Sequence, residues 1–319
     1  MHLSRIFQKN SPPPISNGIT CSLEELLELR HTTRPFWVSG GRQAHSLFAG
    51  NTRSRFRGRG MDYEESRIYT PGDDIRNLDW RVTARSGKVH CKLFTEERDR
   101  PVINLVDFSP SLYFGTKNAF KSVVAARLAA TVAWSAVLNH DRIGGLIQTP
   151  ETSFDLRPRP GRKGVLALIH ALVKASRPPD QAGTFVLETI LHQAQQSIRP
   201  GSRVFLISDF YGLNASCERS LSQLRRHNDL VLCQVIDPLE MSPPAAGFYS
   251  ISDGNRQAVL DTGSAAVRHD YQMTFARRRE KLMRLAANLR SPVLQIVSDD
   301  DLTASLRRGL QPGSGNKKS

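Results

Sequence analysis

Cysteines, aromatic residues and long apolar runs are all scarce in this chain. Only four cysteines occur among 319 residues, and none forms a C-x-x-C pair or stands beside a histidine at metal-ligand spacing. This argues against a disulfide scaffold or a zinc finger and predicts reduced thiols in a reducing compartment. No stretch has the about 20 apolar residues that span a bilayer, and the first residues contain no apolar signal core. We therefore expect a cytoplasmic protein without a transmembrane segment.

Recognisable catalytic motifs are missing as well. The segment Gly161–Gly164 lacks the G-x-x-x-x-G-K-[ST] spacing of a phosphate-binding loop, no G-x-S-x-G elbow occurs, and the histidines are isolated. Because no nucleophile stands with a base, we predict that the chain is not an enzyme. A metal-dependent hydrolase built on Asp73, Asp74 and Asp79 is the least favoured alternative, since no His or Lys lies at a supporting spacing.

Positive charge is abundant. The formal net charge is +14, in a chain with 39% hydrophobic and 23% charged residues, which is a globular composition. Such a charge attracts nucleic acid, anionic lipid or an acidic protein. A nucleic-acid-binding protein that uses Arg53–Arg59 and a basic helix over 270–290 is the alternative class. A solvated loop and the exposed face of a docked helix account better for these two charge runs, so nucleic acid is the less favoured partner.

The chain divides into four parts by composition. Residues 1–20 form a loose leader, 21–99 a segment with a short helix and β-strands, 100–310 the main domain, and 311–319 a disordered tail. Ser22 and Glu25 form a capping box that begins the short helix. In the main domain, apolar strands alternate with helices, and one hairpin is expected at 248–251 with 258–260. The strands are expected at 102–106, 142–147, 203–208, 230–236 and 293–297. The helices are expected at 117–139, 164–175, 184–198, 213–226, 270–290 and 301–310. This alternation predicts an α/β fold with a doubly wound, mostly parallel sheet.

Two of the covered strands end in an aspartate, Asp107 and Asp209. In an open α/β sheet, ligands bind beyond the carboxyl ends of the strands, so both side chains are expected to reach one crevice. Ser109 and Ser111 follow Asp107 at alternate positions. A carboxylate with two hydroxyls is an oxygen set suited to one Mg²⁺ or Mn²⁺ ion. The competing interpretation is that the serines cap a helix near Lys117 and that Asp107 accepts from backbone amides.

The Asp-x-Ser-x-Ser motif after the first strand resembles the metal-ion-dependent adhesion site of von Willebrand factor A domains. That family adds a threonine and a second aspartate from two further loops. Thr184, after Gly183, and Asp209 match these positions in the same chain order. The resemblance implies a site that binds one ion through Asp107, Ser109, Ser111, Thr184 and Asp209, with an acidic residue of a partner protein completing the coordination. Leu112 departs from the usual Met there, but it is not a ligand.

A second motif lies upstream, between residues 67 and 85. It resembles the hallmark of the bacterial domain-of-unknown-function family 58, and its matching residues are Arg67, Tyr69, Gly72, Asp73, Asp74, Arg76, Asp79, Trp80 and Arg85. The resemblance covers about residues 23–310 and implies a von Willebrand A-like domain. Members are often encoded beside MoxR-type AAA+ ATPases, which implies an adaptor that works with such an ATPase in protein maturation or complex assembly.

The hallmark also has a simple physical interpretation. Pro71 and Gly72 favour a tight turn, Pro by presetting φ and Gly by allowing positive φ. The charged residues then form an ion-pair network that locks the segment in place: Asp73, Asp74, Arg76, Asp79 and Arg85. A docking surface or a second acidic metal site are the functional alternatives.

Overall fold

The computed structural model describes residues 18–33, 35, 61–70, 78–96, 101–179, 183–184, 186–252 and 257–310. The predicted disordered tail, the basic loop 53–59 and most of the leader lie outside these residues. The chain forms two compact units, with residues 40–99 separate from the rest. Helix α1 (Leu23–Thr32) therefore belongs to the large unit, whereas the sequence placed it with the 21–99 segment.

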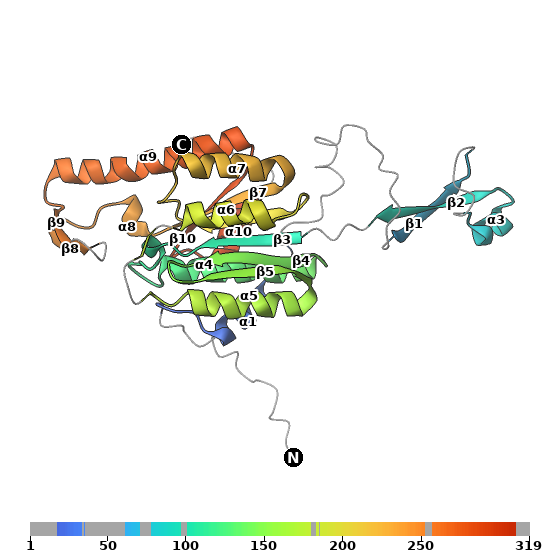
Figure 1. Cartoon of the computed structure of the whole chain (residues 1–319), viewed down its shortest axis with the longest axis horizontal. Helices are drawn as coiled ribbons and strands as arrows, with labels where there is room; N and C mark the ends of the chain where they lie inside the picture. Colours follow the sequence, from blue (N-terminus) through green and yellow to red (C-terminus); the bar gives the residue numbers. More distant parts are fainter. Residues whose placement is uncertain are drawn as a thin grey trace, which may run out of the picture. The chain divides into compact units, whose positions relative to one another are not determined.

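The large unit is built on a six-stranded sheet (Figure 1). The spatial order of its strands is β10 (Val293–Val297), β7 (Asp229–Ile236), β6 (Arg203–Ser208), β3 (Pro101–Asp107), β4 (Arg142–Gln148) and β5 (Ser153–Pro160). All neighbours are parallel except β4 and β5. The predicted mostly parallel sheet is confirmed, and the antiparallel edge strand β5 is an addition that the sequence analysis missed.

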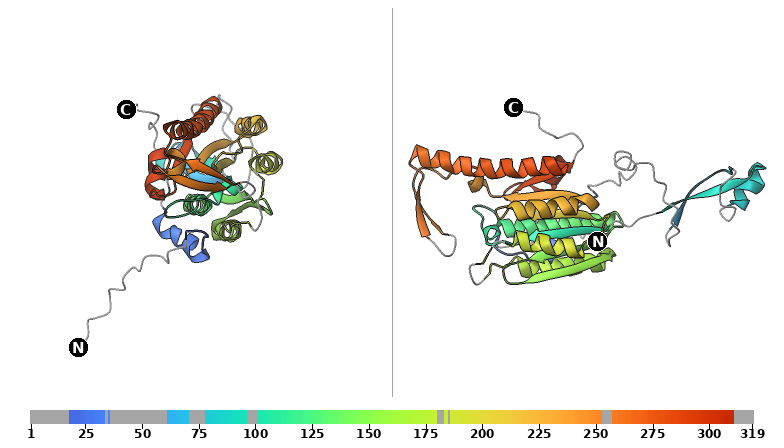
Figure 2. Two further views of the ribbon diagram at one scale, coloured as in Figure 1. Left: turned by 90° about the vertical axis from the view of Figure 1, so that its left-hand side faces the viewer. Right: turned by 45° about the horizontal axis from the view of Figure 1, so that its top comes forward.

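Helices cover both faces of this sheet (Figures 1 and 2). One apolar core joins the sheet to α1, α4 (Lys121–Leu138), α5 (Gly161–Ala175) and α10 (Leu302–Leu310). The other joins it to α6 (Leu187–Ser197), α7 (Ala215–His227) and α9 (Ala265–Leu289). Strand β3 shows why: Val102 and Val106 belong to the first core, while Ile103 and Leu105 belong to the second. A strand apolar on both sides requires cover on both faces, which makes the fold doubly wound.

Helix α4 is the central core helix. Asn104 of β3 donates its side-chain amide to Ala129 O, and Trp134 donates its indole N–H to Leu26 O of α1. Among the described residues α4 is the one helix long and apolar enough to cross a membrane, and 83% of that stretch is buried inside the protein. Burial of this extent is typical of a core helix.

Between β7 and β10 the chain makes a detour. A short helix α8 (Pro238–Met241) leads to the antiparallel hairpin of β8 (Phe248–Ser252) and β9 (Gln257–Asp261), and α9 then returns to the sheet. The predicted hairpin is confirmed, and α9 begins five residues earlier than predicted. A 3₁₀ turn η3 (Pro110–Leu112) follows β3.

The small unit pairs β1 (Met61–Ile68) with β2 (His90–Glu96) in antiparallel fashion and carries the short helix α3 (Trp80–Ser86). Asp79 is the N-cap of α3, and its side chain accepts from the amides of Arg81 and Val82. Gly87 ends the helix with a left-handed φ of 69°, which suits a glycine.

Candidate functional site

Two buried aspartates lie at the carboxyl edge of neighbouring strands. Asp107 ends β3, Asp209 follows β6, and the two strands pair in parallel from Val102 with Arg203 to Val106 with Ile207. The strand order reverses here, because the chain builds β4 and β5 on one side of β3 and β6 on the other. This is the position where open α/β sheets bind ligands, and the sequence correctly predicted that both aspartates reach it.

Asp107 is almost fully buried and accepts three hydrogen bonds. Its Oδ1 accepts from the amide of Ser109 at 2.9 Å and from the hydroxyl of Ser109 at 2.5 Å, while Oδ2 accepts from the hydroxyl of Ser208 at 2.6 Å. The alternative interpretation is therefore partly right, since Asp107 does accept from a backbone amide. Ser109 makes no capping hydrogen bond with its side chain, however.

Ser111 differs from Ser109 in its partners. Its Oγ is shielded from solvent and has no hydrogen-bond partner within the described part of the chain. A buried hydroxyl normally finds a partner, since leaving it unpaired costs about 1–3 kcal/mol. The hydroxyl of Ser111 is therefore available to a polar ligand, as are the equally unpaired hydroxyls of Ser122 and Ser291 elsewhere in the described chain.

The loop that carries Thr184 lies against this serine turn. The amide of Val186 donates to Ser109 Oγ at 3.1 Å. A Cβ added at Gly183 would come within 2.3 Å of Pro150 and within 3.7 Å of Pro110, which stands between the two serines. Thr184 itself is exposed. The structure thus brings the predicted second loop to the first.

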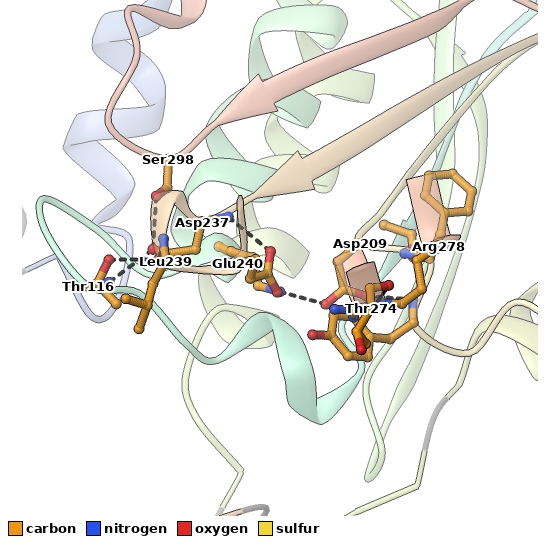
Figure 3. A network of polar contacts seen from close by, with 12 residues as sticks. Thr116, Asp209, Asp237, Leu239, Glu240, Thr274, Arg278 and Ser298 are labelled. Carbon is orange, nitrogen blue, oxygen red and sulfur yellow. Dashed lines mark hydrogen bonds and ion pairs between the residues drawn. The ribbon is translucent and has the colours of Figure 1, made fainter. Parts of the chain in front are cut away.

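A buried lysine, which the sequence analysis overlooked, pairs with Asp209. Lys121 begins α4 with its side chain 1% exposed, and its Nζ donates to Asp209 Oδ2 at 2.8 Å and to Glu240 Oε1 at 2.6 Å. Figure 3 shows Asp209 and Glu240 in this network. The other oxygen of Asp209 accepts from the amide of Tyr211 at 3.1 Å. The signal in the sequence is a charged residue at the start of a mostly apolar helix.

The charges of this edge are unevenly balanced. Burial, and then the nearby Asp209, raise the pKa of Asp107 to about 6. Burial also raises the pKa of Glu240, although Lys121 opposes this. The two carboxylates outweigh the burial of Lys121 and raise its pKa. One ammonium thus serves Asp209 and Glu240, while Asp107 is held by hydroxyls and an amide alone.

This edge gathers oxygen atoms that could act as ligands of a divalent cation. It offers the carboxylates of Asp107 and Asp209, the hydroxyl of Ser109 and the unpaired hydroxyl of Ser111, which are the oxygen donors that Mg²⁺ and Mn²⁺ prefer. In the described part of the chain no group of three or more His, Cys, Asp and Glu side chains could hold a metal. The candidate set has only two carboxylates and relies otherwise on hydroxyls.

The hallmark residues lie in the small unit as far as they are described. Asp79 accepts from the hydroxyl of Ser66 at 2.7 Å besides capping α3, and Arg67 donates to Thr70. Trp80 is 70% exposed. Four members of the predicted set fall outside the described residues: Gly72, Asp73, Asp74 and Arg76. The ion-pair network remains a prediction, and Asp79 is engaged as a helix cap.

The basic helix is confirmed as α9, but part of its charge is paired internally. Lys281 pairs with Glu218 of α7 at 3.4 Å, and Arg284 pairs with Glu280 at 2.5 Å. The four cysteines, Cys21, Cys91, Cys217 and Cys233, are buried thiols that do not form disulfides.

The mostly parallel six-stranded sheet, with helices on both of its faces, defines a doubly wound α/β domain. The chain belongs to the family of proteins of unknown function DUF58, whose family model matches residues 65–281. Uncharacterised proteins of Mycobacterium tuberculosis and Mycobacterium bovis are 28% identical to it over 265 residues, or 80% of this chain and 83% of theirs.

Two solved structures are similar to parts of the chain at low identity. The conserved hypothetical protein BatB from Bacteroides thetaiotaomicron is 15% identical with a TM-score of 0.40, and the match covers 65% of this chain and 93% of BatB. A von Willebrand factor type A protein from Catenulispora acidiphila is 13% identical with a TM-score of 0.41, and the match covers 70% of this chain and 43% of that one.

Proposed function

We propose that this protein is a protein-binding adaptor that binds one Mg²⁺ or Mn²⁺ ion through Asp107, Ser109, Ser111, Thr184 and Asp209. The fold and family support a protein-interaction domain. The observation that carries the ion is the pair of buried carboxylates, Asp107 and Asp209, at one strand edge, with the buried, unpaired hydroxyl of Ser111 in the turn that follows Asp107. A bound cation would give that hydroxyl a partner and would offset the repulsion between Asp107 and Asp209.

The residues of this edge have separate roles in the proposal. Asp107 fixes the hydroxyls of Ser109 and Ser208 and supplies negative charge. Asp209 is held in place by Lys121 and by the amide of Tyr211, so it contributes from a fixed position. When bound, the ion would supply an open coordination position that takes a carboxylate of the partner.

The proposed partner is a MoxR-type AAA+ ATPase or another protein that offers an acidic residue, in the cytoplasm. The proposed role is binding rather than turnover, in protein maturation or complex assembly. A pull-down from a lysate with tagged protein, with and without chelator, tests the partner. Recovery of an AAA+ ATPase only with Mg²⁺ present supports this role, and equal recovery with chelator contradicts it.

The ion itself is tested by calorimetric titration with MgCl₂ and MnCl₂. We expect Asp107→Ala to abolish the binding heat and Ser111→Ala to weaken binding about tenfold, since one neutral ligand is lost, equal to about 1.4 kcal/mol. Asp155→Ala is the matched control, because Asp155 is an exposed aspartate on β5 of the same sheet. Equal heats for the wild type and Asp107→Ala would remove the ion from the proposal.

A further inference from the structure

A tyrosine stands directly beside the candidate ion site. Tyr211 follows Asp209 by two residues and donates its backbone amide to Asp209 Oδ1 at 3.1 Å. Phe210, between them, adopts a left-handed φ of 59° and is buried, with its amide bonded to Ser208 Oγ. This tight turn fixes the start of the Tyr211 side chain, which is 40% exposed.

An arginine from α9 stacks on this tyrosine. The guanidinium carbon of Arg278 lies 3.7 Å from the centroid of the Tyr211 ring. Arg278 and Asp209 also lie close together in Figure 3, and Asp209 acts electrostatically on the arginine. Arg278 thus reaches the ion site although 69 positions in sequence separate it from Asp209 (278 − 209).

Arg278 has unused hydrogen-bonding capacity. Its Nε makes one long hydrogen bond of 3.4 Å to Thr274 O. Its two terminal nitrogens have neither a hydrogen bond nor an ion pair to any residue that the structure describes. Partial burial lowers the pKa of Arg278, which means that its charge is poorly solvated, and Asp209 offsets this only in part.

Three other cations of α9 have partners. Lys281 and Arg284 have carboxylate partners, and Arg268 donates to the carbonyls of Thr262 and Gly263. Arg278 combines half-burial, a stacked orientation and free terminal N–H groups. A stacked guanidinium is held flat and presents a fork that matches a carboxylate in bidentate geometry.

We propose that Tyr211 and Arg278 form a second anion subsite, which binds a carboxylate of the same acidic partner segment that ligates the ion. This inference rests on the proposed function. In an extended strand, residues i and i+2 point to the same side about 7 Å apart. An acidic-x-acidic segment can therefore place one carboxylate on the ion and the next on Arg278. The net charge of +14 favours such a partner.

The test uses two synthetic fluorescein-labelled peptides and the full-length protein in saturating Mg²⁺. One peptide contains Glu-Gly-Glu and the other Glu-Gly-Gln, in the same neutral flanks, and binding is measured by fluorescence anisotropy. We expect Arg278→Gln to lower the affinity for the Glu-Gly-Glu peptide at least tenfold and to leave the affinity for the Glu-Gly-Gln peptide unchanged. Arg279→Gln is the matched control, since it removes the same charge from the exposed neighbouring position, and we expect a change below about twofold.

Different outcomes show whether the anion subsite or the ion site fails. Arg278→Gln should bind Mn²⁺ in calorimetry as the wild type does. Equal losses for Arg278→Gln and Arg279→Gln, or equal losses for the two peptides, overturn the subsite and leave the ion intact. If the wild type takes up no ion, the proposed function fails, and Arg278-dependent preference for Glu-Gly-Glu in chelator still supports the subsite. The subsite is also overturned if the wild type does not bind the Glu-Gly-Glu peptide, or if it binds a phosphopeptide of the same length more tightly than that peptide.

Discussion

Asp107 and Asp237 are both buried aspartates at the carboxyl end of a covered parallel strand, yet their surroundings differ. Asp237 follows β7 and accepts from the amide of Thr116 at 2.9 Å, its hydroxyl at 2.6 Å, the hydroxyl of Ser298 at 3.1 Å and the amide of Leu239 at 2.9 Å. Figure 3 shows these partners around it. Asp107 accepts three hydrogen bonds, is repelled by Asp209 and stands near an unpaired serine hydroxyl.

This difference separates a structural carboxylate from a candidate ligand. The donors around Asp237 come from three segments, after β3, β7 and β10, so this side chain ties the strand ends together. The donors around Asp107 do not offset its burial and the neighbouring Asp209, so the pKa of Asp107 is raised. Glu240 and Lys121 connect the two regions, since Glu240 accepts from the amide of Asp237 and from Lys121, which also holds Asp209.

Removing the connecting lysine should have the largest effect. Lys121→Met leaves Asp209 and Glu240 buried without a cation, and we expect the free energy of unfolding to fall by about 3–5 kcal/mol. Urea denaturation followed by circular dichroism measures the loss. Lys117→Met is the matched control, because Lys117 lies four residues earlier, before α4, and is 58% exposed although it also pairs with a carboxylate, Asp299.

The control should leave the free energy of unfolding almost unchanged, since exposed ion pairs contribute little. Similar values for the two variants would show that Lys121 is not an essential counter-ion, and the two regions would then be independent of each other.

The two aspartates themselves should respond differently to the same substitution. Asp237→Ala leaves the hydroxyls of Thr116 and Ser298 without their acceptor, and we expect a loss on the order of 2–3 kcal/mol. Asp107→Ala also loses hydrogen bonds but removes the repulsion with Asp209, so its loss in ion-free buffer should be smaller. Urea denaturation in the presence of chelator measures both. A loss for Asp107→Ala that equals or exceeds that of Asp237→Ala would contradict the distinction.

The sequence predicted the two aspartates of this edge, because their positions follow from where the strands end. Asp107 and Asp209 were found because each follows an apolar strand, and the carboxyl ends of parallel strands meet at one edge. The serines followed from their spacing. Strand β5 was missed because its residues are alternately exposed and half-buried and include Pro158 and Pro160, which is typical of a loop as much as of an edge strand.

Lys121 and Arg278 could not be found in this way. A lysine at the start of a helix and an arginine in a basic helix are ordinary in sequence, and their importance comes from partners 88 positions away in one case and from stacking on Tyr211 in the other. Long-range pairing of this kind depends on strand order and on the detour through α8 and α9. Local patterns carry no information on either.

The smallest expected effect is the pH dependence that arises from Asp107. Its pKa in the fold is about 6, raised from 3.8, so the folded protein holds this proton more tightly than the unfolded chain does. Without ion, the contribution of this group to stability should therefore increase as the pH falls from about 6 towards about 4. An ion must displace the same proton, so Mn²⁺ affinity should fall about tenfold per pH unit below about pH 6.

Calorimetric titration at pH values from about 7 to about 5 measures the affinity, and urea denaturation of the wild type and Asp107→Asn in chelator measures the stability. Asp107→Asn lacks the titrating group, so its stability relative to the wild type should be higher at pH 7 than at pH 5. A Mn²⁺ affinity that stays constant across this range would mean that Asp107 is not a ligand.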